Sequence, residues 1–226
     1  MVSSVVYQTV VDKMPGYSWH ITEGPQSQEI MVGVKKNMTA FFTQKTGFQS
    51  GQSTLRPGAL LTVKVGEKHY PLLFLHLKSL TVPRGFGLRD DQTERAIKFR
   101  KTLDKAAKGK ANYIFLGDLN TMGMNLTYSP KDVSGAEEIE RLRKRAAKRD
   151  MVILDKRGPS WWPGSKSSYS PSNLDHVVAA DHLNFKLFGG KPVDLRGWPE
   201  ETADAKKDKW VERFSDHALL YFEVQK

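Results

Sequence analysis

Hydrophobic and polar positions alternate in short runs along most of the chain, a pattern typical of strands joined by turns. This pattern predicts strands at residues 29–36, 39–43, 60–65, 70–77, 112–116, 174–180, 185–188 and 218–224. Gly66 and Glu67 separate two of these runs and form a hairpin signal. The sequence therefore predicts a fold in which many strands are joined by hairpins.

Apolar residues at helical spacing predict three helices among these strands. One runs from the N-terminus to about residue 13, one covers residues 88–108, and a strongly basic one covers residues 135–149. Segments 156–173 and 189–210 are predicted to be long loops, long enough to carry function. Together, these elements predict an α/β protein in which two largely antiparallel sheets pack face to face and helices flank them.

The composition is that of a globular protein with a sizeable core. The chain has 226 residues, of which 39% are hydrophobic and 27% are charged, and a single domain over residues 1–226 is expected. No apolar run approaches the ~20 residues of a membrane span. The absence of cysteine excludes disulfides, a cysteine nucleophile and a thiolate zinc site. No signal peptide is predicted, and the compartment stays open.

The charge of the chain favours anionic partners. Thirty-five basic residues against 25 acidic ones give a formal net charge of +10. Such a surplus favours nucleic acid, phosphorylated lipid or an anionic membrane surface as a partner. The basic tract at residues 141–145 is either a solvated helix face or a contact to a nucleic-acid backbone.

Short polar clusters follow several of the predicted strands. They are HLKS at 76–79, GDLN at 117–120, LDHV at 174–177 and SDHA at 215–218, and RDDQ at 89–92 lies near the start of the long helix. Layered folds place their active sites where strands end, so these clusters predict one.

The ordered set resembles the endonuclease/exonuclease/phosphatase superfamily, which has the deoxyribonuclease I-like fold. The resemblance covers residues 17–224, and the family patterns are His-Leu-x-Ser, Arg-x-x-Gln, Gly-Asp-Phe-Asn, Asp-His-Ile and Ser-Asp-His-Pro. Leu119 and Ala218 replace Phe and Pro, which leaves the polar residues intact. The resemblance implies a four-layer fold and a metal-dependent phosphoesterase.

The resemblance also implies a role for each polar residue in the attack of water on phosphorus. Asp118 would activate the water or hold the metal ion, and Asn120 and His76 would donate hydrogen bonds to phosphate oxygens. His217 would donate to the developing oxyanion, with Asp175 fixing its tautomer.

Asp216 is expected to hold the metal ion together with Asp118. The oxygen ligands and the absence of cysteine favour Mg²⁺, with Mn²⁺ as the alternative.

Three further residues are weaker candidates. Arg89 either reaches phosphate or braces the loop after His76. Glu29 is expected to orient His76 or, as the alternative, to bind the metal ion. Ser79 ends the first motif.

In the loop before Asp175, Trp161, Trp162 and Tyr169 either stack on a base or lipid headgroup or are buried anchors.

Family members begin with a strand carrying a metal-site Asn and a second strand ending in Gln-Glu. Here the chain starts at the following helix, and Gln28-Glu29 lies further downstream. The chain is therefore expected to be an N-terminally shortened domain that lacks the first strands of the family.

Three functions remain open at this point. The first is a nuclease or other phosphodiesterase acting on nucleic acid. The second is a hydrolase of phospholipid or inositol phosphate, like sphingomyelinases and phosphoinositide phosphatases. The third is a non-catalytic chain that binds polyanions.

Overall fold

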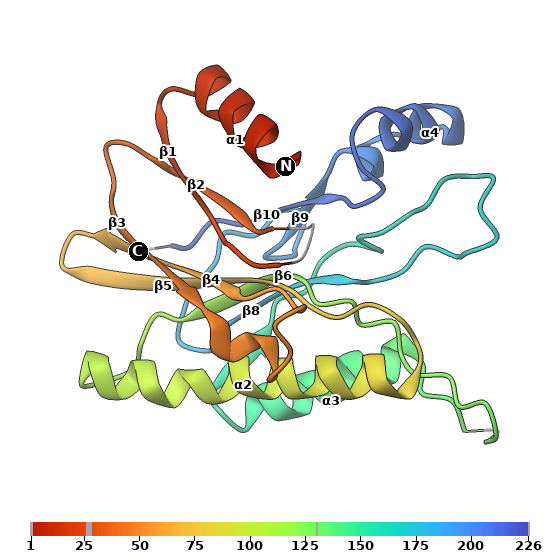
Figure 1. Ribbon diagram of the computed structural model, residues 1–226, viewed down its shortest axis with the longest axis horizontal. Helices are drawn as coiled ribbons and strands as arrows, with labels where there is room; N and C mark the ends of the chain where they lie inside the picture. The colour runs from red at the N-terminus through yellow and green to blue at the C-terminus, as the bar shows by residue number, and fades with distance from the viewer. Residues whose placement is uncertain (1, 26–28, 130, 226) are drawn as a thin grey trace. The chain divides into compact units, whose positions relative to one another are not determined.

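The computed structural model describes residues 2–25, 29–129 and 131–225. The chain divides into two compact units, each with its own strands and helices (Figure 1). Unit 1 comprises Met1–Lys78 and Gly87–Leu119, and unit 2 comprises Ser79–Phe86 and Asn120–Lys226. The single domain that the sequence predicts stays a prediction.

Unit 1 begins with helix α1 (Val2–Lys13), which lies beside an antiparallel hairpin of β1 (Tyr17–Ile21) and β2 (Met31–Lys35). Strands β3 (Thr39–Lys45), β4 (Gly58–Val65) and β5 (Lys68–His76) follow as an antiparallel sheet, with the short helix η1 (Thr46–Gln49) between β3 and β4. Helix α2 (Pro83–Ala107) then leads to β6 (Ile114–Asp118), which pairs with β5 in parallel.

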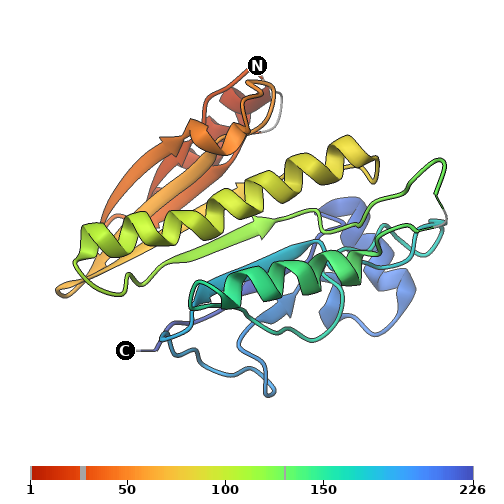
Figure 2. The same ribbon diagram turned by 90° about the horizontal axis from the view of Figure 1, so that it is seen from below.

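The sheet of unit 1 is covered on both faces, which explains why β4 is an almost continuous apolar run. On one face, residues of β2 pack against alternate residues of β4; the buried members of this cluster are Val32, Val34, Ala59, Leu61 and Val63. On the other face lies α2, where the ring of Phe99 meets Tyr113 edge to face at 5.8 Å (Figure 2).

Unit 2 contains α3 (Gly135–Ala147), β7 (Met151–Ile153), β8 (Asp175–Ala180), β9 (Asp194–Arg196), η2 (Trp198–Glu200), α4 (Asp204–Arg213) and β10 (Leu219–Tyr221). β7 pairs with β8 and β9 pairs with β10, both antiparallel. A capping box between Ser134 and Glu137 starts α3. Every residue of β8 is buried, as expected for a strand covered on both faces.

The fold class expected from the sequence is confirmed: an α/β protein with mostly antiparallel strand pairs and flanking helices. The hairpin at Gly66-Glu67 is confirmed as well, and α2 begins at Pro83, earlier than expected, since proline suits the first turn of a helix. In the described residues, no helix is both long and apolar enough to cross a membrane.

Two expectations for the C-terminal part were wrong. Segment 189–210 is not one long loop, because it contains β9, η2 and most of α4. The sequence of α4, DAKKDKWVER, has only Ala205, Trp210 and Val211 as apolar residues, so it lacks the apolar stripe that predicts a helix. Residues 185–188 form only isolated bridges, from Phe185 to Val224 and from Phe188 to Lys191, because no continuous partner strand lies beside them among the described residues.

Gly117 is expected to be essential for the β5–β6 pairing. Its φ is +127°, and a Cβ there would lie 2.1 Å from the carbonyl oxygen of Leu75. Strain and overlap should make Gly117→Ala lower the free energy of unfolding by about 3 kcal/mol or more in urea denaturation. Gly66→Ala is the control, since φ there is +58° but no atom lies within 4 Å. Gly66→Ala should lower the free energy of unfolding by only about 1–2 kcal/mol. An equal decrease in both variants would contradict the prediction.

Candidate active site

In unit 1, two of the predicted residues lie side by side at the ends of parallel strands. His76 ends β5 and Asp118 ends β6, and the strand register makes them direct partners. Nε2 of His76 lies 3.3 Å from Oδ2 of Asp118. The amide of Leu77 donates to the carbonyl of Asp118 at 2.9 Å, which continues the pairing past the strand end. Because β5 and β6 are parallel and in register, both strands end at the same edge of the sheet, and this brings His76 and Asp118 together.

The RDDQ segment braces the chain just after His76. The carbonyl of Lys78 accepts a hydrogen bond from Arg89 at 3.2 Å, and its amide donates to Oε1 of Gln92 at 3.2 Å. Arg89 and Gln92 are both buried. Of the two interpretations of Arg89, the structure therefore shows the bracing contact.

Arg56 is a residue of this region that the sequence analysis missed. Its Nη1 donates a hydrogen bond to the carbonyl oxygen of His76 at 3.5 Å. Burial lowers the pKa of the Arg56 guanidinium, while the negative charges of Asp118 and Glu29 act in the opposite direction. Arg56 precedes β4 in an irregular segment and belongs to no motif, so no sequence signal marked it.

Glu29 accepts a hydrogen bond at 2.7 Å from the hydroxyl of Thr22, which itself accepts from the amide of Ile30 at 2.9 Å. This network holds the carboxylate at the entrance to β2. The expected pairing of Glu29 with His76 and its role as a metal ligand stay predictions, and Gln28 lies outside the described residues.

In unit 2, Asp175 and His217 form a carboxylate–histidine pair. Asp175 is the first residue of β8, and its Oδ2 lies 2.8 Å from Nδ1 of His217. The amide of Asp175 donates to Oγ of Ser160 at 2.9 Å, which fixes the start of the strand. An ionised carboxylate only accepts hydrogen bonds, so Nδ1 of His217 carries the proton that faces Asp175.

Three tryptophans hold Asp216, the neighbour of His217. Nε1 of Trp161 donates to Oδ2 of Asp216 at 2.8 Å. The carbonyl of Asp216 accepts from the amide of Trp162 at 2.9 Å and from Nε1 of Trp198 at 3.1 Å. Trp162 is a buried anchor, whereas Tyr169 on the same loop is 73% exposed. The loop before Asp175 therefore fixes Asp216 through Trp161 and Trp162 and leaves the ring of Tyr169 in solvent.

A buried polar network lies next to Asp175. Nζ of Lys156 donates to the carbonyl of Asp175 at 2.8 Å and lies 3.4 Å from Nδ1 of His176. Because an ammonium group only donates, Nδ1 of His176 accepts and its Nε2 carries the proton. That Nε2 lies 2.8 Å from Oγ1 of Thr121, whose hydroxyl donates to the carbonyl of Asn173 at 2.6 Å.

Burial controls the protonation states in this network. Burial and the charge of Lys156 lower the pKa of His176 to about 3, so its imidazole is neutral at neutral pH. Burial also lowers the pKa of Lys156 to about 8, against the attraction of Asp175 and Asp155. His176 is thus a packing residue, and Lys156 is a support of Asp175 that no motif indicated.

Asn120 and Ser79 also belong to unit 2. Asn120 is buried and has a φ of +50°, a left-handed conformation that asparagine tolerates better than most residues. Ser79 is exposed. In the basic tract, Arg143 lies 3.6 Å from Glu140, and Arg141 lies over the ring of Phe86 at 5.8 Å. A nucleic-acid contact of this tract stays a prediction.

His176 should make the protein sensitive to acid. The imidazole of His176 takes up a proton near pH 6.5 in the unfolded chain and only near pH 3 in the folded protein. Between these two pH values, the unfolded state therefore binds more protons than the folded state. The free energy of unfolding should therefore fall as pH drops from about 6.5, by up to about 1.4 kcal/mol per pH unit from this group.

Urea denaturation at pH 4–6.5 tests this dependence. His176→Gln removes the titrating group and should flatten the slope, while His20→Gln, on the partly exposed strand β1, should leave it unchanged. Identical slopes in all three proteins would contradict the assignment.

Comparison with known proteins supports the fold. No family model matches the chain, and neither does any curated protein. Truncated Caenorhabditis elegans TDP2 matches with a TM-score of 0.61 and 16% identity, over 96% of this chain and 79% of that one. The chain covers 61% of a longer form of C. elegans TDP2.

Two other solved structures match over almost the whole chain. D. rerio TDP2 complexed with a single-strand DNA product matches with a TM-score of 0.61 and 14% identity, over 98% of this chain and 82% of that one. A Bacteroides thetaiotaomicron mannosyl-6-phosphatase matches with a TM-score of 0.53 and 12% identity, over 97% of this chain and 80% of that one. At these identities the likeness establishes the fold, and it extends over residues of both units.

Proposed function

We propose that this chain, which has the deoxyribonuclease I-like fold of the endonuclease/exonuclease/phosphatase superfamily, is a metal-dependent phosphodiesterase acting on nucleic acid. The observation that carries the proposal is the 2.8 Å contact between Asp175 and His217. A buried carboxylate that fixes one imidazole nitrogen leaves the other to serve as an acid or a base. The His76–Asp118 pair supports the same chemistry.

The proposed roles follow from the donor and acceptor capacity of each side chain. Asp118 accepts a proton from the attacking water. His217 donates from Nε2 to the oxyanion that develops on phosphorus, and Asp175 favours its ionised form. His76 and the amide of Asn120 donate to phosphate oxygens. Only Leu119 separates Asp118 from Asn120, so the chain keeps both at the end of β6.

Asp118 and Asp216 each offer carboxylate oxygens, the ligand type that a hard divalent cation prefers. Oδ2 of Asp216 already accepts from Trp161, and Oδ2 of Asp118 lies near His76. A carboxylate has about four lone-pair sites, so one such contact still allows a metal ion to bind. We propose that these two carboxylates hold Mg²⁺, or Mn²⁺, which would stabilise negative charge on the phosphate and acidify water.

Two observations support nucleic acid as the substrate. The net charge of +10 attracts polyphosphate chains, and D. rerio TDP2, which has a similar structure, was solved with a single-strand DNA product. A specific observation also favours a second candidate, a smaller phosphate ester, because one matching structure is a mannosyl-6-phosphatase.

Removing either proposed acid–base group should abolish most of the activity. Asp118→Asn and His217→Ala should each reduce the cleavage of labelled single-stranded DNA and plasmid DNA in Mg²⁺ by at least ~100-fold. His69→Ala is the control, since His69 is exposed and belongs to no motif.

Assays on DNA, sphingomyelin, inositol phosphates and a sugar phosphate decide between the candidates. We expect the highest kcat/KM on DNA. A preference above about tenfold for any other substrate would overturn the proposed substrate. Absence of turnover on all of them, with salt-sensitive DNA binding, would indicate a non-catalytic polyanion-binding protein.

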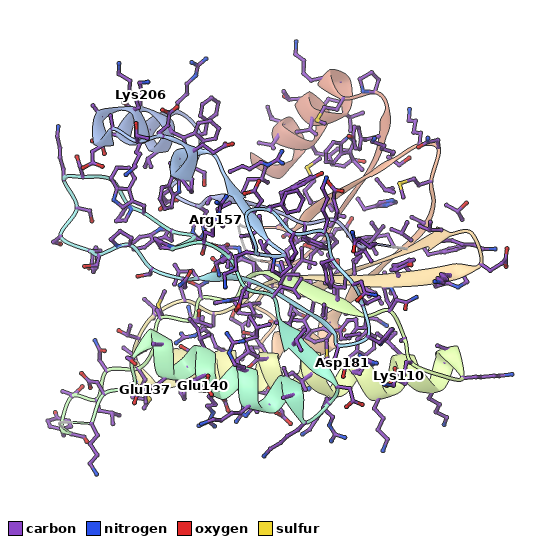
Figure 3. The ribbon with its side chains drawn as sticks, turned by 180° about the vertical axis from the view of Figure 1, so that it is seen from behind. Lys110, Glu137, Glu140, Arg157, Asp181 and Lys206 are labelled. Carbon is purple, nitrogen blue, oxygen red and sulfur yellow. The ribbon has the colours of Figure 1, made fainter. Side chains whose placement is uncertain are left out.

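A chelator should stop the reaction, and Mg²⁺ should restore it. Asp216→Asn removes one charge from the proposed cation site, so it should raise the Mg²⁺ concentration for half-maximal rate by at least about tenfold. The exposed Asp181, which directly follows β8 (Figure 3), provides the control Asp181→Asn. An unchanged Mg²⁺ concentration for half-maximal rate in Asp216→Asn would show that Asp216 is not a ligand of the metal ion.

A further inference from the structure

One face of helix α4 carries three exposed basic residues, the partly buried Trp210 and, at its end, the exposed Phe214. Lys206, Lys209, Trp210 and Arg213 recur at intervals of three and four residues, which places them on the same side of the helix. Phe214 follows directly. We call these five residues the α4 surface; Lys206 marks it in Figure 3.

The two aromatic residues of the α4 surface differ in burial: Trp210 is partly buried against the core of unit 2, whereas Phe214 is open to solvent. The side chain of Phe214 is 60% exposed, and its ring centroid lies 4.5 Å from that of Trp210. Trp210 in turn packs so closely on Gly197 that a Cβ there would lie 2.9 Å from the indole ring. The guanidinium of Arg213 lies 5.3 Å from the centre of the Phe214 ring. An anchored, exposed ring beside a cation is a stacking platform.

The charge of the α4 surface is positive. Its residues line a cleft of about 230 Å³ together with Glu201, which lies 4.0 Å from Nζ of Lys206. Helix α4 has three acidic side chains. Asp204 pairs with Lys207 at 3.1 Å, Asp208 accepts from the amide of Ser165 at 2.8 Å, and the exposed Glu212 is not among the residues that line the cleft. Three cations therefore meet one carboxylate around an aromatic floor, which is complementary to phosphates joined to flat bases.

The chain connects this surface directly to the proposed catalytic residues. Phe214 is followed by Ser215, Asp216 and His217, so its Cα lies within about 11 Å of that of His217. A nucleic-acid strand on the α4 surface would thus reach His217 within about three nucleotides, at roughly 3.4 Å or more per nucleotide.

We propose that the α4 surface binds single-stranded nucleic acid, with an unpaired base stacked on Phe214 and phosphates held by Lys209 and Arg213. The inference rests on the proposed function for its choice of partner and specifies that partner further. Bases inside a duplex offer no free face for stacking, so single strands should bind more tightly than duplexes.

Binding is best measured without turnover. The full chain is titrated into a fluorescein-labelled oligothymidylate in EDTA, and anisotropy is read. Phe214→Ala should weaken binding by about tenfold, within a range of about 5- to 100-fold, and Phe214→Tyr should restore it to within about threefold. Phe41→Ala is the matched control, an aromatic residue on β3 that is 63% exposed; it should change binding less than twofold.

The lysine contact is tested through the salt dependence. Each phosphate contact on a single strand contributes about −0.7 to the slope of log K against log salt. Lys209→Ala should therefore reduce the magnitude of that slope by about 0.7. Lys101→Ala, another exposed lysine on a helix, should leave it unchanged.

Two results would overturn the inference. One is equal binding by Phe214→Ala and Phe41→Ala. The other is loss of binding to phosphatidylserine vesicles in Phe214→Ala with oligothymidylate binding intact, which would make the α4 surface a membrane contact.

These outcomes are separate from those that test catalysis. If Phe214 controls binding but Asp118→Asn and His217→Ala cleave normally, only the proposed catalytic roles fail. If those two variants are inactive but binding ignores Phe214, only the role of the α4 surface fails.

Discussion

The in-register parallel pairing of β5 and β6 is the constraint on which unit 1 depends. It sets His76 beside Asp118, because both residues end their strands at the same level. The pairing is so close at this point that Gly117 has no room for a Cβ against the Leu75 carbonyl. Arg89 then holds the carbonyl of Lys78 and Gln92 holds its amide. A short polar pair at the strand ends is thus fixed by backbone geometry, with buried side chains bracing the loop that follows.

Unit 2 positions its polar residues through a satisfied buried network. Buried polar groups are costly when they lack partners and rigid when they have them. Ser160 accepts from the amide of Asp175, Lys156 donates to its carbonyl, and His217 contacts its side chain. Each atom of Asp175 that matters for the proposed chemistry is therefore held separately. A neutral His176 beside a charged Lys156 is the electrostatic consequence of this arrangement.

The same fold serves several phosphate esters, so the surface around the polar residues must select the substrate. In this chain, the residues before Ser215 supply an exposed aromatic ring and cations, and the loop before Asp175 supplies two of the three tryptophans that hold Asp216. These features lie outside the shared motifs. In the proposed function, they are the features that would select a partner with both phosphates and flat bases.

The sequence by itself determined β2 to β6, β8 and β10, the hairpin at Gly66-Glu67 and the polar residues at the strand ends, because these signals are local. It did not indicate the short strands β1, β7 and β9. It did not reveal α4, whose mostly polar surface hides the helical period, nor the roles of Arg56 and Lys156. Arg56 contacts a residue 20 positions away and Lys156 one 19 positions away. Contacts of that kind depend on how the chain folds back on itself, so only the tertiary structure decided them.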